Sequence, residues 1–138
     1  MGSGSGTMMR LGDTDQRLAD PTQDIRGRKV LDRDGHEIGK VDDLLIDVER
    51  KKVRLLRVDH GGVLGIGGTP LFIPAEAVER VTDDRVGIDR SRDQVVDAPQ
   101  YDPDLVDEDR YFTDLYGHYG YSPYWAPGYV PPARRFFH

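Results

Sequence analysis

Cysteine is absent from the chain, which excludes disulfide bridges and thiolate metal sites and fits a reducing compartment. No run of about 18 or more apolar residues occurs, so neither a transmembrane helix nor membrane insertion is predicted. No secretory signal peptide is evident either. The net charge of −6 disfavours nucleic-acid binding, which depends on a basic surface. Together these absences predict a cytoplasmic protein with no nucleic-acid partner.

Tyrosine and tryptophan are missing from the chain before Tyr101. All seven tyrosines, beginning with Tyr101, and the single tryptophan lie in the last 38 residues, whereas the middle of the chain is built from Val, Leu, Ile and Gly. The sequence therefore joins a compact aliphatic module to an aromatic tail rich in proline and glycine. We place the boundary near Pro99 and Pro103, because proline interrupts regular structure.

The first 23 residues show no apolar periodicity. The Gly/Ser-rich stretch up to Met8 reads as a cloning scar, because it is a flexible linker that ends at a second methionine. The polar residues from Met9 to Thr22 are predicted to form a flexible leader.

Short apolar runs and turn signals alternate from Ile25 to Ile88, which predicts a small all-β domain. Ala75–Val78 is expected to form a single helical turn. About six strands without a sustained helix predict a small closed or half-closed barrel, because closure removes exposed strand edges. The expected strands are 28–31, 37–46, 53–59, 69–73, 79–82 and 85–88, with a possible short strand at 93–98.

Glycine and proline mark the expected turns of this domain. Gly35 is free to take a positive φ in the turn 32–35, and Gly39 predicts a bulge or a sharp bend. Pro74 is expected to end the fourth strand, because it has no N–H to donate. Gly61 and Gly62 open a glycine-rich loop that is followed by a strand and not by a helix. This order favours a wide hairpin loop over a phosphate-binding loop.

The strand at 53–59 is apolar on both faces, because Leu56 and Val58 alternate with Val53 and Leu55. A second apolar face predicts a second contact surface, and pairing of two subunits is its simplest source. Apolar residues at the tip of the glycine-rich loop are further contact candidates. The candidates of this region are Leu55, Val63, Leu64 and Ile66.

No catalytic or metal-binding constellation is legible in the sequence. None of the four histidines has a helical His partner, and Asp59 and His60 point to opposite faces of a strand. The acidic residues between Asp102 and Asp109 lack the ligand spacing of a calcium loop, which favours a solvated linker over a weak Ca²⁺ or Mg²⁺ site. We therefore expect no enzymatic activity, no cofactor and no bound metal.

The aromatic tail has three interpretations. Residues 105–116 can form a short helix, with Leu105, Phe112 and Leu115 near one face, whereas the residues from Gly117 onward are predicted to be irregular. The tail then binds a partner, packs onto its own barrel, or remains disordered. Partner binding is favoured, because Tyr and Trp offer large contact areas at low entropic cost. The candidate contact residues are Tyr119, Tyr121, Tyr124, Trp125 and Tyr129.

Several short motifs between residues 25 and 88 occur in a characteristic order. They are Gly27-x-x-Val30, Asp34-Gly35-x-x-Ile38-Gly39-Lys40-Val41-x-Asp43-Leu44, Ile46-Asp47, the glycine-rich loop, and Leu71-x-Ile73-Pro74. In this order and spacing they resemble the PRC-barrel family. That family includes the cytoplasmic domain of the photosynthetic reaction-centre H subunit, the C-terminal domain of a ribosome-maturation factor, and small stand-alone proteins.

The resemblance is closest to the stand-alone members, because this chain shows neither the membrane helix of the H subunit nor the extra domain of the ribosome factor. It implies protein interaction or scaffolding, with no shared catalytic residue. We therefore expect a leader at 1–23, a six-stranded PRC-type β-barrel at 24–98 and a tail at 99–138. The expected function is a non-catalytic scaffold that forms a homodimer and binds an unidentified protein. The alternative is a domain that binds a small ligand or a divalent metal, with a stress- or photosynthesis-associated role.

Overall fold

Seven strands form one sheet in the computed structural model, which describes residues 8–13, 24–47, 52–60, 70–98, 108–121 and 125. The mostly β architecture predicted from the sequence is confirmed. The strands are β1 (Met8–Arg10), β2 (Lys29–Leu31), β3 (Glu37–Asp47), β4 (Lys52–Asp59), β5 (Leu71–Pro74), β6 (Val78–Val81) and β7 (Arg85–Ile88).

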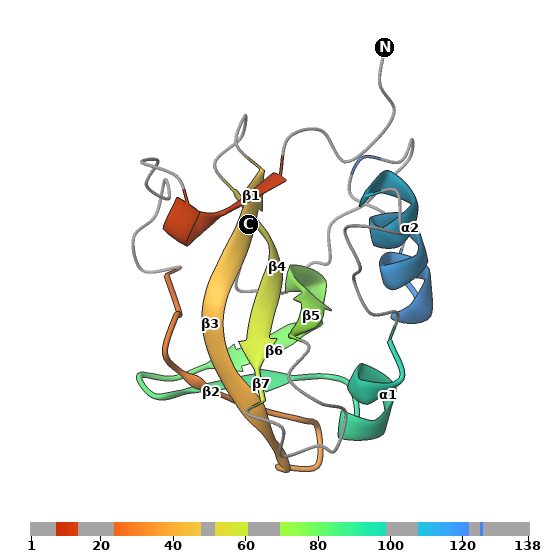
Figure 1. The fold of residues 1–138 in the computed structure, drawn as a ribbon. Coiled ribbons are helices and arrows are strands. Elements are labelled where there is room, and N and C mark those ends of the chain that lie inside the picture. Colours follow the sequence, from red (N-terminus) through yellow and green to blue (C-terminus); the bar gives the residue numbers. More distant parts are fainter. Residues whose placement is uncertain are drawn as a thin grey trace.

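The main path of the sheet runs in the order β5-β4-β3-β2-β7-β6, and β1 pairs with β3 beside it. The β2–β7 pair is parallel and the other pairs are antiparallel. The long strand β3 curves so that β2, β7 and β6 lie across one end of β3 and β4 (Figure 1). Among the described residues no ladder joins β5 to β6, so the sheet is not closed. The single helical turn η3 (Ala75–Ala77) connects these two strands instead.

The curvature of β3 coincides with two bulges along it. Val30 pairs with Gly39 and Leu31 with Glu37, which leaves Ile38 as an extra residue directly beside Gly39. A second extra residue, Asp42, lies between the positions of β3 that pair with β4. A bulge bends its strand and increases the local twist. The two bulges therefore curve β3, so that the strands paired with it, β2 and β4, do not lie in one plane.

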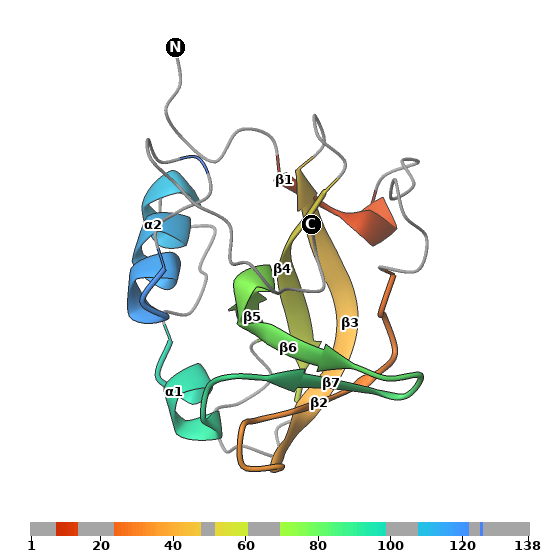
Figure 2. The same ribbon diagram turned by 180° about the vertical axis from the view of Figure 1, so that it is seen from behind.

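Both apolar faces of β4 are buried. A bulge at Arg54 interrupts the alternation, and Leu55 and Leu56 on its far side are both fully buried. Part of the cover comes from the same chain, because helix α2 (Glu108–His118) stands beside β5 in both views (Figures 1 and 2). Tyr111 of α2 packs edge-on against Phe72 of β5, with ring centroids 6.1 Å apart. The second face that suggested subunit pairing is thus contacted from within the chain.

The strand expected at 93–98 is wrong, because these residues belong largely to helix α1 (Arg92–Val96). Ser91 caps this helix by accepting a hydrogen bond from the Gln94 N–H, and Val95 is buried. The Ser-x-x-Gln spacing is a helix-start signal that outweighs the strand propensity of two valines. The short helix predicted in the tail is present, but it covers Glu108–His118 and not 105–116.

Residues 8–13 are ordered against β3, so the flexible leader expected at Met9–Thr22 is wrong for this part. Met8, Met9 and Arg10 pair with Asp47, Ile46 and Leu45. The turn η1 (Leu11–Asp13) then buries Leu11, and the Gly12 N–H donates to Asp43 Oδ1 at 3.1 Å. The reason is that β3 is much longer than β2, which leaves an open strand edge for β1 to pair with.

Candidate functional site

The buried aromatic side chains of the tail are tied to the barrel through its backbone carbonyls. The Tyr116 hydroxyl donates to the Arg54 carbonyl oxygen at 3.3 Å, and the Tyr119 hydroxyl donates to that of Phe72 at 3.4 Å. The rings of Tyr116 and Tyr119 are almost completely buried. Each tyrosine therefore supplies apolar area and satisfies a carbonyl of β4 or β5.

A glycine turn ends α2 and reverses the chain toward the barrel. The Tyr121 N–H donates to the Tyr116 carbonyl at 2.9 Å, and the Gly120 N–H donates to that of Gly117 at 3.0 Å. Gly120 has a φ of 81°, which completes the Schellman pattern of a helix C-terminus. Tyr121, which follows the turn, and Trp125 are both half-buried and pack against the core. The Trp125 ring packs edge-on against Tyr116, with centroids 5.8 Å apart.

Arg90, just after β7, fastens this turn to the barrel. Its Nη2 donates to the Tyr119 carbonyl at 2.8 Å, and its guanidinium carbon lies 5.0 Å from the centre of the Tyr121 ring. Its Nη1 is 2.8 Å from Asp89 Oδ1. Burial and the neighbouring Asp89 carboxylate raise the pKa of Tyr121 to about 12, so the phenol stays protonated at neutral pH.

Helices α1 and α2 are joined by a pair of hydrogen bonds. His118 Nε2 lies 2.7 Å from the Gln94 carbonyl oxygen, and Gln94 Nε2 donates to the His118 carbonyl at 3.3 Å. A carbonyl oxygen only accepts, so Nε2 of His118 carries the proton in this arrangement. The histidine that ends α2 therefore has a structural partner.

Asp32 organises the turn between β2 and β3. Its carboxylate accepts hydrogen bonds from the N–H groups of Asp34, His36 and Arg92 at 2.9, 2.7 and 2.8 Å. Burial disfavours its charge, but these donors outweigh burial and hold the pKa of Asp32 below its ordinary value. Gly35 takes a φ of 87° in this turn. Asp32 thus connects the first hairpin to the start of α1.

The same turn brings together three groups of the kind that bind metals. Ligand atoms of Asp32, Asp34 and His36 lie within 4.8 Å of one another. Both oxygens of Asp32 already accept N–H groups, and His36 Nδ1 lies 3.3 Å from Asp32 Oδ2. These contacts explain why the three groups lie close together, because they stabilise the turn.

The residues proposed from the sequence as contact sites divide into three groups. Leu55 and Tyr119 are buried inside the chain, which corrects the expectation that they lie on a contact surface. Tyr121 and Trp125 keep part of their surface exposed. The remaining contact candidates and two loop glycines lie outside the described residues, and they are Gly61, Gly62, Val63, Leu64, Ile66, Tyr124 and Tyr129.

Three of the structural residues proposed from the sequence lie in the described part of the chain, and they are Gly35, Gly39 and Pro74. Gly39 passes so close to β4 that an added Cβ would lie 2.4 Å from the Asp59 carbonyl oxygen. Pro74 is the last residue of β5 and precedes η3. Sequence reasoning missed Arg90 and His118, because both act through partners that are distant in the sequence.

The family model described as PRC-barrel domain matches residues 21–95, which is more than half of the chain. The resemblance drawn from the sequence motifs is therefore confirmed. The match ends within α1, so α2 and the aromatic residues of the tail lie outside it. A comparison with curated proteins found no significant match. No helix in the described part of the chain is long and apolar enough to span a membrane.

Proposed function

We propose that this chain, which belongs to the PRC-barrel domain family, is a non-catalytic protein-interaction module that self-associates. One observation carries the proposal. Helix α2 lies outside the family match, and it holds a set of aromatic side chains against β4 and β5 with Tyr121 and Trp125 half-buried at its end. We call Tyr121 and Trp125 the aromatic ridge.

The aromatic ridge has the physical character of a contact surface. Its two side chains combine large apolar area with a polar atom, and such residues dominate the binding energy of many interfaces. The ring of Tyr121 is held by Arg90, and that of Trp125 packs on Tyr116. Because the rings are held in place before binding, less conformational entropy is lost on association. A small exposed area can then contribute more to the binding free energy.

The engagement of the titratable groups supports a non-catalytic role. Asp32 is saturated by backbone donors, and His118 is bonded to a backbone carbonyl. The raised pKa of Tyr121 keeps that phenol protonated and disfavours its use as a base at neutral pH. In these contacts Asp32 stabilises a turn, and His118 joins α2 to α1.

Sedimentation equilibrium of the full chain tests self-association through the aromatic ridge. We expect a concentration-dependent dimer, and we expect Trp125→Ala to weaken the dimer by about tenfold or more. Met9→Ala is the matched control, because Met9 is an exposed apolar side chain on β1, away from the ridge. A chain that stays monomeric up to high concentration would contradict self-association. Equal weakening by both substitutions would contradict the role of the ridge.

A further inference from the structure

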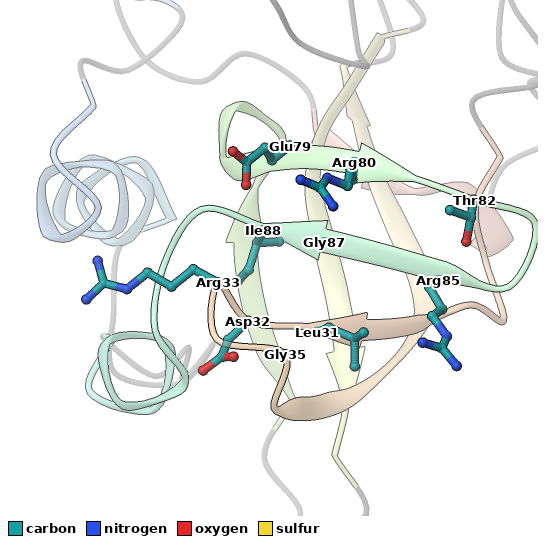
Figure 3. Close-up of a pocket in the computed structure, with 10 residues that line it drawn as sticks. All are labelled: Leu31, Asp32, Arg33, Gly35, Glu79, Arg80, Thr82, Arg85, Gly87 and Ile88. Carbon is teal, nitrogen blue, oxygen red and sulfur yellow. The ribbon is translucent and has the colours of Figure 1, made fainter.

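A pocket of about 360 Å³ opens on the outer face of β2, β7 and β6 (Figure 3). The strand register explains why it exists. Gly87 pairs with Leu31 of β2 on one side and with Arg80 of β6 on the other, so the three residues form one row across the sheet. The middle position of this row has no side chain, which leaves a hollow between its neighbours. We call this hollow the Gly87 pocket.

A bulge at the edge strand adds a second side chain to the wall of the pocket. Val78 pairs with Ile88 and Arg80 with Gly87, so Glu79 is an extra residue in β6. Consecutive residues of a regular strand point to opposite faces, but a bulge re-aims one of them. Both Glu79 and Arg80 therefore line the pocket.

Three arginines surround the Gly87 pocket. Arg80 lies beside Gly87, whereas Arg33 and Arg85 extend at opposite ends (Figure 3). Within the described part of the chain, the side chains of Arg33 and Arg80 make no ion pair or hydrogen bond. Arg85 lies 3.9 Å from Asp84, and both side chains are well exposed, so water screens this pair strongly. The chain as a whole is acidic, which makes this cationic pocket a local exception.

The acidic residues near the pocket balance only part of this positive charge. Asp32 lines the pocket and keeps its negative charge, but backbone N–H donors occupy its carboxylate in place of an arginine. Asp84 accepts from the Thr82 hydroxyl at 3.1 Å. Glu79 is the one further carboxylate in the described lining, and it stands against three guanidinium groups. With three arginines against the two carboxylates of Asp32 and Glu79, the lining keeps an excess of one positive charge.

We propose that the Gly87 pocket binds a small organic anion, in which a carboxylate or phosphoryl group is attached to a short apolar stem. Guanidinium groups bind both kinds of acidic group through two parallel N–H donors. Leu31 is partly exposed in the wall and offers apolar contact to the stem. The volume lies within the range of small-molecule sites and is too small for a folded partner. This binding is independent of self-association through the aromatic ridge.

Titration of the full ¹⁵N-labelled chain by NMR tests the proposal, with glutarate as the carboxylate probe and inorganic phosphate as the phosphoryl probe. Sodium chloride keeps the ionic strength constant. We expect saturable shifts of the amide signals of Leu31, Arg80 and Gly87. The probe that saturates at the lower concentration identifies the preferred acidic group.

Three variants connect the shifts to the Gly87 pocket. The double variant Arg80→Gln with Arg85→Gln should weaken binding by about tenfold or more, because it removes two charge-assisted donors. Lys52→Gln is the control, because it also removes an exposed cation but lies on β4 outside the pocket. Gly87→Ala should also weaken binding by narrowing the hollow. Its Cβ would meet Arg80 Cβ at 3.4 Å, which is an acceptable contact, so the fold should be retained.

Two outcomes would overturn the proposal. One is that the shifts from both probes stay linear up to high concentration or match those from chloride alone. The other is that the arginine double variant, with an intact spectrum, binds as tightly as Lys52→Gln. Saturable binding that the arginine variant loses and Lys52→Gln retains would support the site.

Discussion

The hydroxyl of Tyr116 donates a hydrogen bond to the carbonyl oxygen of Arg54, 3.3 Å away, although 62 positions separate the two residues in the chain. Arg54 is the bulge residue of β4, and Tyr116 lies in the third turn of α2. The bond therefore links the helix of the tail to β4, the strand next to β5 in the sheet. Because the Tyr116 ring is fully buried, α2 is part of the hydrophobic core and not an appendage.

The first prediction concerns this link. Tyr116→Ala should lower the free energy of unfolding by about 3–5 kcal/mol, because it leaves a cavity where a buried ring packs. Tyr116→Phe keeps the ring and removes only the hydroxyl, so we expect a loss of about 1 kcal/mol. Urea denaturation followed by circular dichroism measures both values. If Tyr116→Ala unfolds at the wild-type urea concentration, α2 does not stabilise the barrel.

The second prediction concerns the close approach of β3 to β4. Gly39→Ala should lower the free energy of unfolding by about 1–3 kcal/mol or more, because the new Cβ would lie 2.4 Å from a backbone oxygen of Asp59. Gly117→Ala is the matched control in α2, where an added Cβ meets nothing within 4 Å. There we expect a gain of about 0.5–1 kcal/mol, because alanine favours helix. Equal thermal shifts for the two variants would contradict the close approach as the cause.

The strands from β2 to β7 could be predicted from the sequence, because each has a short apolar run bounded by turn residues. The periodicity of aliphatic residues is local information. The strands that it predicts at 37–46 and 53–59 end within one residue of β3 (Glu37–Asp47) and β4 (Lys52–Asp59). The start of α1 also has a local signal in the sequence, the capping pair Ser91 and Gln94, but two adjacent valines favoured a strand. In that case the capping signal was the better guide.

The partners of the tail and the Gly87 pocket could not be predicted, because both depend on register. Gly87 forms a hollow only because Leu31 and Arg80 lie opposite it, and those pairs join strands far apart in sequence. Composition alone left partner binding, packing onto the barrel and disorder open for the tyrosines. The choice depends on whether carbonyls of β4 and β5 lie within reach of their hydroxyls, which only the fold determines.

The third prediction concerns Asp32 and its dependence on pH. The pKa of Asp32 is lowered in the folded chain, so its stabilising contribution is present above the ordinary carboxyl pKa of about 4 and is lost as the pH falls through the folded value. Asp32→Asn should cost about 1–3 kcal/mol at pH 7, since it removes a charged acceptor from three N–H donors.

Urea denaturation of wild type and Asp32→Asn from pH 7 down to pH 3 measures this effect. The stability difference should be constant near neutral pH and should shrink below about pH 4. Asp34→Asn is the control, because Asp34 is an exposed neighbour in the same turn. A difference between wild type and Asp32→Asn that does not change with pH would contradict the role of the Asp32 charge.

The last prediction concerns the attachment of the glycine turn by Tyr121 at high pH. The pKa of Tyr121 is raised to about 12, so the folded state favours the protonated phenol. Its contribution is fully present below the ordinary tyrosine pKa of about 10 and is lost as the pH rises toward the folded value. Wild type should therefore lose stability between these two pH values faster than Tyr121→Phe, which keeps the ring over Arg90 but has no titrating hydroxyl. Denaturation curves at pH 9, 10, 11 and 12 make the comparison, and other tyrosines and lysines titrate equally in both proteins. Parallel losses in the two proteins would show that the Tyr121 hydroxyl is not responsible for the alkaline weakening of the turn.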